Sequence, residues 1–264
     1  MSTTTFAQAS AVTQRAPLEF DIEINDRWSA ARWPNGGYLL ATAARAALAV
    51  GDHPHILSAT AQYARPPKPG PAQVLLEQIH MGRGVSQIRA TLRQDDEVRV
   101  ESMLTLGSLM KGASTDWQSD SPSFPRPGVY PALRVPSVAP SGDPVPIMDE
   151  IVIHMDLDTA FWLEPSGTGE LRAWLSLPDN EPFDPVSLIF ASDALPPATF
   201  DIYPTRWAPT ISLTTYIRAL PADGPVRILQ RANMVLDGQV DQSCYIWDRT
   251  GKLVAHSTQL GTLR

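Results

Sequence analysis

One carboxylate in this sequence lies inside an apolar stretch, where its chemistry would differ from that of a surface aspartate. Asp193 belongs to the segment LIFASDAL, which spans residues 188–195. Burial among apolar groups penalises the charged form of a carboxylate and raises its pKa towards that of a useful general base. Such a base could take a proton from a bound water molecule. The alternative interpretation is an exposed polar residue that caps a loop at a helix end.

A second candidate for chemistry is the tripeptide Asn35-Gly36-Gly37, which precedes an Ala/Leu-rich run. Asn35 is a suitable N-cap, so the backbone N–H groups that follow it would point out of the start of a helix. Free N–H groups and the helix dipole favour negative charge, including the oxyanion of a carbonyl under attack. Gly36 and Gly37 carry no side chain to block a close approach. The alternative role for the two glycines is tight helix packing.

Two helices are predicted to carry these candidates. The first begins after Asn35 and contains the run GGYLLATAARAALAV, which is apolar nearly all round and therefore typical of a buried helix. The second begins after Asp184, which is a good N-cap, with Pro185 in the first turn. We expect this second helix to extend to the neighbourhood of Pro196 and Pro197.

A strand-rich stretch follows each helix, and the two stretches resemble each other. They span residues 58–109 and 210–263, and strand-like alternation also precedes each helix, at 20–24, 150–155 and 171–177. Landmarks recur at an offset of 153 to 155 residues, which indicates an internal duplication. The matched landmarks are Tyr63 with Tyr216, Arg65 with Arg218, Arg83-Gly84 with Asp237-Gly238, and the 94–97 turn with the 248–251 turn.

Prolines separate the two halves. Eight of the 25 prolines fall between Pro122 and Pro146. Proline lacks a backbone donor and cannot continue a helix or a central strand, so this segment is predicted to be a long extended connection. The predicted organisation is an N-terminal tail at 1–19, a first repeat at 20–110, a linker at 111–147 and a second repeat at 148–264. A loop inside one domain is the alternative for the linker.

The predicted fold class is α+β. A helix that is apolar all round must be covered by its own sheet, because no other element in so short a half could bury it. A curved antiparallel sheet wrapped around a long helix is the hotdog fold. Two tandem hotdog repeats would pair edge to edge into one continuous sheet, which removes two exposed edges.

The order and spacing of several segments resemble those of the TesB-type (thioesterase II) double-hotdog acyl-CoA thioesterases. The segments are NGGYLLATAA, YARPPKPG with RGVSQIRATLRQDDEV, FASDALPP, APTISLTTYIRALP and AHSTQLGTLR. The resemblance implies hydrolysis of acyl-CoA to a free acid and CoA by direct attack of water. It places the three residues that hold this water on Asp193, Thr210 and Gln259. Substrate binding at Asn35, Gly36 and Gly37 is expected instead from the predicted helix start described above. It implies no cofactor and no metal, and it allows a homodimer of double hotdogs.

Two features separate this sequence from well-known members of the family. Thr210 is followed by Ile-Ser rather than Ile-Asp-His, and the segment between Asp193 and Thr210 is shorter. That segment would lie close to the path of an acyl chain, so the preferred chain length stays open. Thr210 and Gln259 are uncharged and can orient water by donating and accepting hydrogen bonds. For Gln259 the alternative is a strand position that faces solvent.

The charge, the cysteine content and the hydropathy of the chain exclude several classes of protein. The 21 basic and 28 acidic residues give a net charge of −7, which argues against a general nucleic-acid or membrane-surface binder. The single cysteine, Cys244, excludes an intrachain disulfide. The polar N-terminus and the lack of a long apolar run predict a cytoplasmic protein without a membrane span.

Two functions other than thioester hydrolysis stay open. One is non-catalytic binding of acyl-CoA or lipid; the other is enoyl-CoA hydration, although no histidine lies near either predicted helix start.

Overall fold

The computed structural model describes residues 4–124 and 133–263. Antiparallel strands dominate its secondary structure, and α2 is the one long helix among the described residues. The helices are α1 (Phe6–Ala9), α2 (Gly36–Val50), α3 (Ile147–Glu150) and α4 (Pro185–Ala191), with a 3-10 helix, η3, at Ala198–Asp201. The strands are β1 (Thr13–Ala16), β2 (Glu19–Ile24), β3 (Ser29–Ala30), β4 (Trp33–Pro34), β5 (His55–Tyr63), β6 (Gly70–Met81), β7 (Ser86–Gln94), β8 (Glu97–Gly107), β9 (Leu133–Arg134), β10 (Val152–Met155), β11 (Glu170–Ser176), β12 (Thr210–Ile217), β13 (Val226–Leu236), β14 (Gln239–Trp247) and β15 (Leu253–Thr262).

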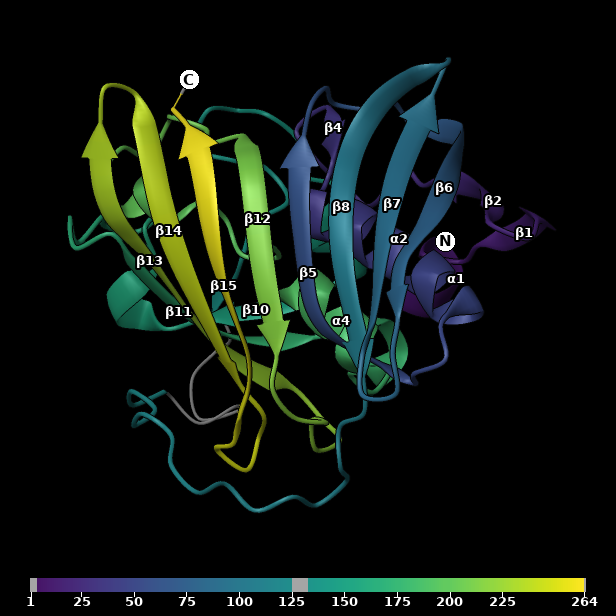
Figure 1. Cartoon of the computed structure of the whole chain (residues 1–264). Coiled ribbons are helices and arrows are strands. Elements are labelled where there is room, and N and C mark those ends of the chain that lie inside the picture. Colours follow the sequence, from purple (N-terminus) through teal and green to yellow (C-terminus); the bar gives the residue numbers. More distant parts are fainter. Residues whose placement is uncertain (1–3, 125–132, 264) are drawn as a thin grey trace.

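A single 13-stranded antiparallel sheet runs through both halves in the order β1-β2-β6-β7-β8-β5-β12-β15-β14-β13-β11-β10-β9. The halves meet at β5 and β12, which pair from Ser58 with Tyr216 to Gln62 with Ser212. Figure 1 shows the curved sheet with α2 and α4 behind it, and the two helices contact each other. The predicted α+β double hotdog with one continuous sheet is therefore confirmed.

The two helices begin where the sequence predicts, but the second is much shorter than expected. Asn35 caps α2 by accepting from the Tyr38 N–H, and Asp184 caps α4 by accepting from the Ser187 N–H. The α4 helix ends at Ala191, after seven residues, rather than near Pro196. The Ser192 hydroxyl donates to the Ile189 carbonyl, and side chains that bond to nearby backbone in this way compete with helical geometry. The prediction of a long helix in each half is therefore wrong for the second half.

The internal repeat is present in three dimensions, but at the Tyr63 landmark its register differs by one residue from the one read off the sequence. The N–H groups of Ala64 and Arg65 both donate to the Arg99 carbonyl, and those of Arg218 and Ala219 both donate to the Val254 carbonyl. Ala64 thus corresponds to Arg218, an offset of 154, so Tyr63 corresponds to Ile217 and not to Tyr216. A slip of one residue moves a strand side chain to the other face of the sheet.

The proline-rich connection contains a little regular structure where it is described. Strand β9 adds to the edge of the sheet beside β10, and Val138 pairs with Pro144 in an isolated bridge. Phe124 packs against Trp174 and Trp247. Pro125, Pro127 and Pro131 lie outside the described residues, so the extent of the linker stays a prediction.

The segment that precedes the first repeat is packed against both halves. Phe6 on α1 is buried and its ring stacks on Phe190 of α4, 5.2 Å between centroids. The N–H groups of Phe6 and Ala7 donate to the two carboxylate oxygens of Glu181, at 2.8 and 3.1 Å. The Phe6 ring also lies 5.3 Å from that of Trp28 in the first repeat. Residues 4–9 therefore connect the two repeats on the helical side of the sheet. Among residues 4–124 and 133–263, no helix has both the length and the apolar character that crossing a bilayer would need.

Candidate active site

Asp193 lies just beyond the end of α4, in a turn that the sheet holds in place. Its backbone N–H donates to the Phe190 carbonyl at 3.0 Å, which closes the last turn. The preceding Ser192 donates its hydroxyl to the Ile189 carbonyl and lies 2.8 Å from the Thr215 hydroxyl on β12. The chain that carries Asp193 is therefore tied both to its own helix and to the inner face of the sheet.

The start of α2 points at the Asp193 carboxylate. The Gly37 N–H donates to Asp193 Oδ2 at 2.8 Å. Asn35 donates from Nδ2 to the Asp193 carbonyl at 2.8 Å and to Oδ2 at 3.2 Å, while its Oδ1 caps the helix. A helix N-terminus carries partial positive charge and stabilises a nearby carboxylate. All three residues that the sequence assigns to substrate binding thus lie at the predicted general base.

Only glycine fits at the point of closest approach between α2 and Asp193. A methyl group placed on Gly37 would lie 2.8 Å from Asp193 Cβ, which is closer than real side chains come, and 3.0 Å from the Phe190 carbonyl oxygen. The two halves therefore meet here at backbone distance. The contact of Gly37 with Asp193 and Phe190 is consistent with both roles considered for the glycines, close approach to a bound group and tight helix packing.

Thr210 and Gln259 come from neighbouring strands, and a β-bulge brings them to the same face. Gln259 on β15 lies opposite Leu213 on β12, while Thr210 lies opposite Gly261 because Ile211 is an extra residue in the ladder. In a regular strand Ile211 would face inward and Thr210 outward. A bulge re-aims side chains in this way, and bulges are common next to active sites. Strand alternation read from the sequence could not have revealed this change of face.

Gln259 connects the other two predicted site residues. Its Nε2 donates to Asp193 Oδ1 at 3.1 Å, and it also donates to the Thr210 hydroxyl. The three side chains come from the turn after α4, the start of β12 and the last strand. The structure therefore brings together all three residues that the resemblance selects, although their catalytic roles stay predictions.

The Asp193 carboxyl is unusually basic for an aspartate. Desolvation by burial is the largest influence on it and raises its pKa to about 6. The hydrogen bonds from Gly37, Gln259 and Asn35 act in the opposite direction, because they stabilise the charged form. A carboxylate with this pKa is ionised at neutral pH and is a competent proton acceptor.

The pseudo-symmetric position in the other half lacks this chemistry. Asp193 lies nine residues after the N-cap Asp184. The residue nine positions after the N-cap Asn35 is Ala44, which is fully buried. Among the described residues, the candidate site therefore takes its base from the second repeat and its helix start from the first.

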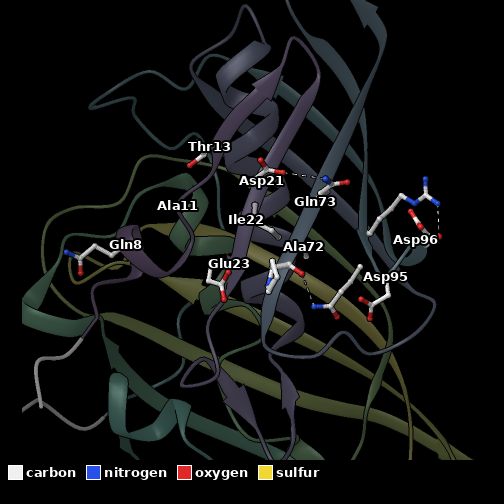
Figure 2. Close-up of a pocket in the computed structure, with 13 residues that line it drawn as sticks. Gln8, Ala11, Thr13, Asp21, Ile22, Glu23, Ala72, Gln73, Asp95 and Asp96 are labelled. Carbon is white, nitrogen blue, oxygen red and sulfur yellow. Dashed lines mark hydrogen bonds between the residues drawn. The ribbon is translucent and has the colours of Figure 1, made fainter.

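A separate hollow on the first repeat does not match the predicted site. It has a volume of about 660 Å³ and is lined by α1, β2, β6 and the turn between β7 and β8 (Figure 2). None of the six predicted site residues lines it. Its charged residues are Asp21, Glu23, Asp95 and Asp96 against the single cation Arg93, so it would repel the phosphates of a CoA.

Sequence models of known families match most of the chain. The model of the acyl-CoA thioesterase N-terminal domain matches residues 24–107, and that of the acyl-CoA thioesterase C-terminal domain matches residues 129–263. An uncharacterised protein of Mycobacterium tuberculosis is 26% identical over 262 residues, which cover 91% of this chain and 89% of that protein.

Solved structures show the same fold. A candidate thioesterase II from Thermobifida fusca YX superposes with a TM-score of 0.89 at 28% identity, covering 98% of this chain and 99% of that one. The acyl-CoA thioesterase II TesB2 of Mycobacterium marinum has a TM-score of 0.77 at 18% identity, with 98% of each chain covered, which is a likeness in fold. Because the two domain models follow each other in order along the chain, this protein belongs to the acyl-CoA thioesterase family.

Proposed function

We propose that this protein hydrolyses acyl-CoA to a free carboxylic acid and CoA by direct attack of a water molecule. Asp193 is the general base, and Thr210 and Gln259 orient the water. The observation that carries the proposal is that one amide, that of Gln259, donates to both the Asp193 carboxylate and the Thr210 hydroxyl. Membership of the acyl-CoA thioesterase family supports the choice of substrate.

The reaction needs no covalent acyl-enzyme. The water oxygen bonds to the thioester carbonyl carbon while Asp193 takes a proton from the water. The carbonyl oxygen becomes an oxyanion, and the tetrahedral intermediate then collapses as the carbon–sulfur bond breaks. The CoA thiolate leaves and receives the proton from Asp193, so the base returns to its starting state. A thiolate is a good leaving group, so a positioned and activated water is sufficient.

The start of α2 has two roles in this mechanism. Its N–H groups stabilise the ionised form of Asp193, as the Gly37 hydrogen bond illustrates. The same partial positive charge would favour an oxyanion that forms beside Asn35, Gly36 and Gly37. Substrate binding by these three residues is part of the proposal and follows from their place next to the base.

A comparison of three activities tests the proposal. We would incubate the protein with a panel of acyl-CoAs and follow free thiol, enoyl absorbance and binding. Thiol release supports hydrolysis; loss of enoyl absorbance without thiol indicates a hydratase; binding without either indicates a binding protein. Among the described residues, no histidine hydrogen-bonds to Asp193, which disfavours the hydratase.

Side-chain variants test the roles of Thr210 and Gln259. Thr210→Ala and Gln259→Ala should each lower kcat by less than Asp193→Asn does, because the remaining pair still places the water. The double variant should lose less than the product of the two single effects, since parts of one water site fail together. KM should change little. Thr258→Ala is the matched control, because Thr258 is exposed beside Gln259 on the same strand. Equal effects of Thr258→Ala and Gln259→Ala on kcat would contradict the assigned roles.

A further inference from the structure

Tyr63, which the sequence does not mark as a site residue, ends β5 and lies at the candidate active site. Inward-facing residues of this strand include Ala59 and Ala61, and alternation places Tyr63 on the same inner face. Its hydroxyl donates to the Gly36 carbonyl at 2.8 Å. The Tyr63 side chain is therefore hydrogen-bonded to the backbone of Gly36, the first residue of α2.

The hydrogen bond from Tyr63 acts on the same peptide group that holds Asp193. The Gly36 carbonyl and the Gly37 N–H belong to one planar peptide unit. Its oxygen accepts from Tyr63, and its N–H donates to Asp193 Oδ2 at 2.8 Å. Hydrogen bonds in such a chain polarise one another, by about 10–30% per bond. The phenol therefore both orients this N–H and strengthens it as a donor.

Tyr63 and Asp193 close on Gly36 from two sides. A methyl group placed on Gly36 would lie 3.0 Å from Asp193 Oδ2 and 3.1 Å from the Tyr63 hydroxyl oxygen. A side chain on Gly36 would therefore require the phenol or the carboxylate to move by a few tenths of an ångström. The Gly36–Gly37 peptide therefore lies between Tyr63, which donates to its carbonyl, and Asp193, which accepts from its N–H.

The tyrosine is present only in the half that carries this helix start. The structural counterpart of Tyr63 in the second repeat is Ile217, which is buried. Nine residues after its N-cap, the second repeat has Asp193 and the first has Ala44. The phenol and the carboxylate thus have no polar counterpart at these two positions, and both bond to the same peptide at the start of α2.

We propose that Tyr63 is a positioning residue that directs the Gly36–Gly37 peptide N–H at Asp193. The expected effect on kcat rests on the proposed function. The expected effect on the pKa of the Asp193 carboxyl rests on the geometry alone. Loss of the phenol weakens the N–H donor, which makes the ionised carboxylate less stable and raises the pKa of Asp193.

The titratable groups next to Asp193 do not change their protonation state in the pH range in which Asp193 titrates. Among the described residues, its charge acts on Tyr63 from β5 and Cys244 from β14. Burial, and then the charge of Asp193, raises the pKa of both groups, so both stay protonated at neutral pH. The surrounding donors Asn35 and Gln259 do not titrate. A change between pH 4 and 8 at this site therefore reports the Asp193 carboxyl.

The experiment compares wild-type protein, Tyr63→Phe and the control Tyr216→Phe. The control removes a hydroxyl from an exposed tyrosine on the outer face of the adjacent strand. The phenyl ring of Tyr63→Phe retains the packing, so folding should be preserved and is checked by circular dichroism. We expect the acid limb of the kcat profile to move up by about half a pH unit in Tyr63→Phe, a roughly threefold lower kcat on that limb, with KM unchanged. Tyr216→Phe should not move it.

A readout independent of activity separates this inference from the proposed function. ¹³C NMR of labelled aspartate carboxyls, with the Asp193 signal identified by its loss in Asp193→Asn, gives the pKa directly. A higher pKa in Tyr63→Phe than in wild type and Tyr216→Phe supports the positioning role even if no acyl-CoA is hydrolysed. The same carboxyl pKa in all three proteins, or a change in KM alone, would overturn it.

Discussion

Asp193 accepts a hydrogen bond at 2.8 Å from the backbone N–H of Gly37, which lies 156 residues earlier in the chain. The carboxylate belongs to the second repeat and the N–H to the first. The partial positive charge at the start of α2 offsets part of the cost of burying the carboxylate, so neither repeat contains the site by itself. The candidate site is therefore a composite of the two repeats.

The pH dependence of the wild-type reaction follows from the Asp193 carboxyl. Because its pKa is raised to about 6, the base is protonated below that pH and cannot accept a proton from water. We expect kcat to be half-maximal near this pKa and to fall about tenfold for each further pH unit below it. Saturating acyl-CoA assays between pH 4.5 and 8 measure this limb. A kcat that stays constant down to pH 4.5 would exclude a base of this kind.

Asp193→Asn should make the protein more stable at neutral pH. The folded-state pKa of about 6 lies above the ordinary value of 3.8, so the folded protein binds a proton more tightly between these values. Wild-type stability therefore falls as pH rises through this window, by at most about 3 kcal/mol. Asparagine cannot ionise and avoids this loss.

Urea unfolding at pH 4 and pH 7.5 measures the effect. The gain in unfolding free energy of Asp193→Asn over wild type should be larger at pH 7.5. A gain, or a loss, that is the same at both pH values would show that burial of the charge is not its origin.

Gly37→Ala should impair the site through the backbone. The new methyl group would contact Asp193 Cβ and the Phe190 carbonyl at 2.8 and 3.0 Å, so α2 and the Asp193 turn must move apart. We expect a lower kcat and a loss of about 1–3 kcal/mol in unfolding free energy. Gly84→Ala is the matched control, because a methyl group there meets no atom within 4 Å. Similar behaviour of the two variants in urea unfolding and thiol-release assays would contradict the close approach.

Phe6→Ala should destabilise the whole protein although Phe6 lies near the N-terminus. Its ring is buried between Trp28 of the first repeat and Phe190 of the second, so truncation would leave a cavity between the repeats. We expect a loss of about 3 kcal/mol in unfolding free energy. Trp117→Ala is the control, because this ring is 83% exposed. A midpoint of thermal unfolding that is unchanged in Phe6→Ala would show that residues 4–9 do not join the repeats.

Features with a local cause could be predicted from the sequence. Asn35 and Asp184 cap helices because their side chains bond to backbone N–H groups within the same turn. The Asp237-Gly238 turn forms because both residues adopt positive φ, which glycine and aspartate tolerate. Asp193, Thr210 and Gln259 were selected by resemblance, and the fold brings them together.

Features that depend on register or on tertiary contacts could not be predicted. The bulge at Ile211 decides which face Thr210 occupies, and no local pattern marks it. The sequence pattern aligns Tyr63 with Tyr216, and only the backbone hydrogen bonds show that its counterpart is Ile217. The close contact of Gly37 with Asp193 depends on how α2 packs against α4. Each of these is set by pairing between distant segments.

The measurement that tests the central claim most directly is thiol release from acyl-CoA by wild-type protein and Asp193→Asn under saturating substrate. We predict that the substitution lowers kcat by about 10²–10⁴-fold, the usual effect of losing a general base, while KM changes little. The folded state of the variant is checked by circular dichroism. Full activity in a folded Asp193→Asn protein would contradict the assignment of Asp193 as the base that activates water.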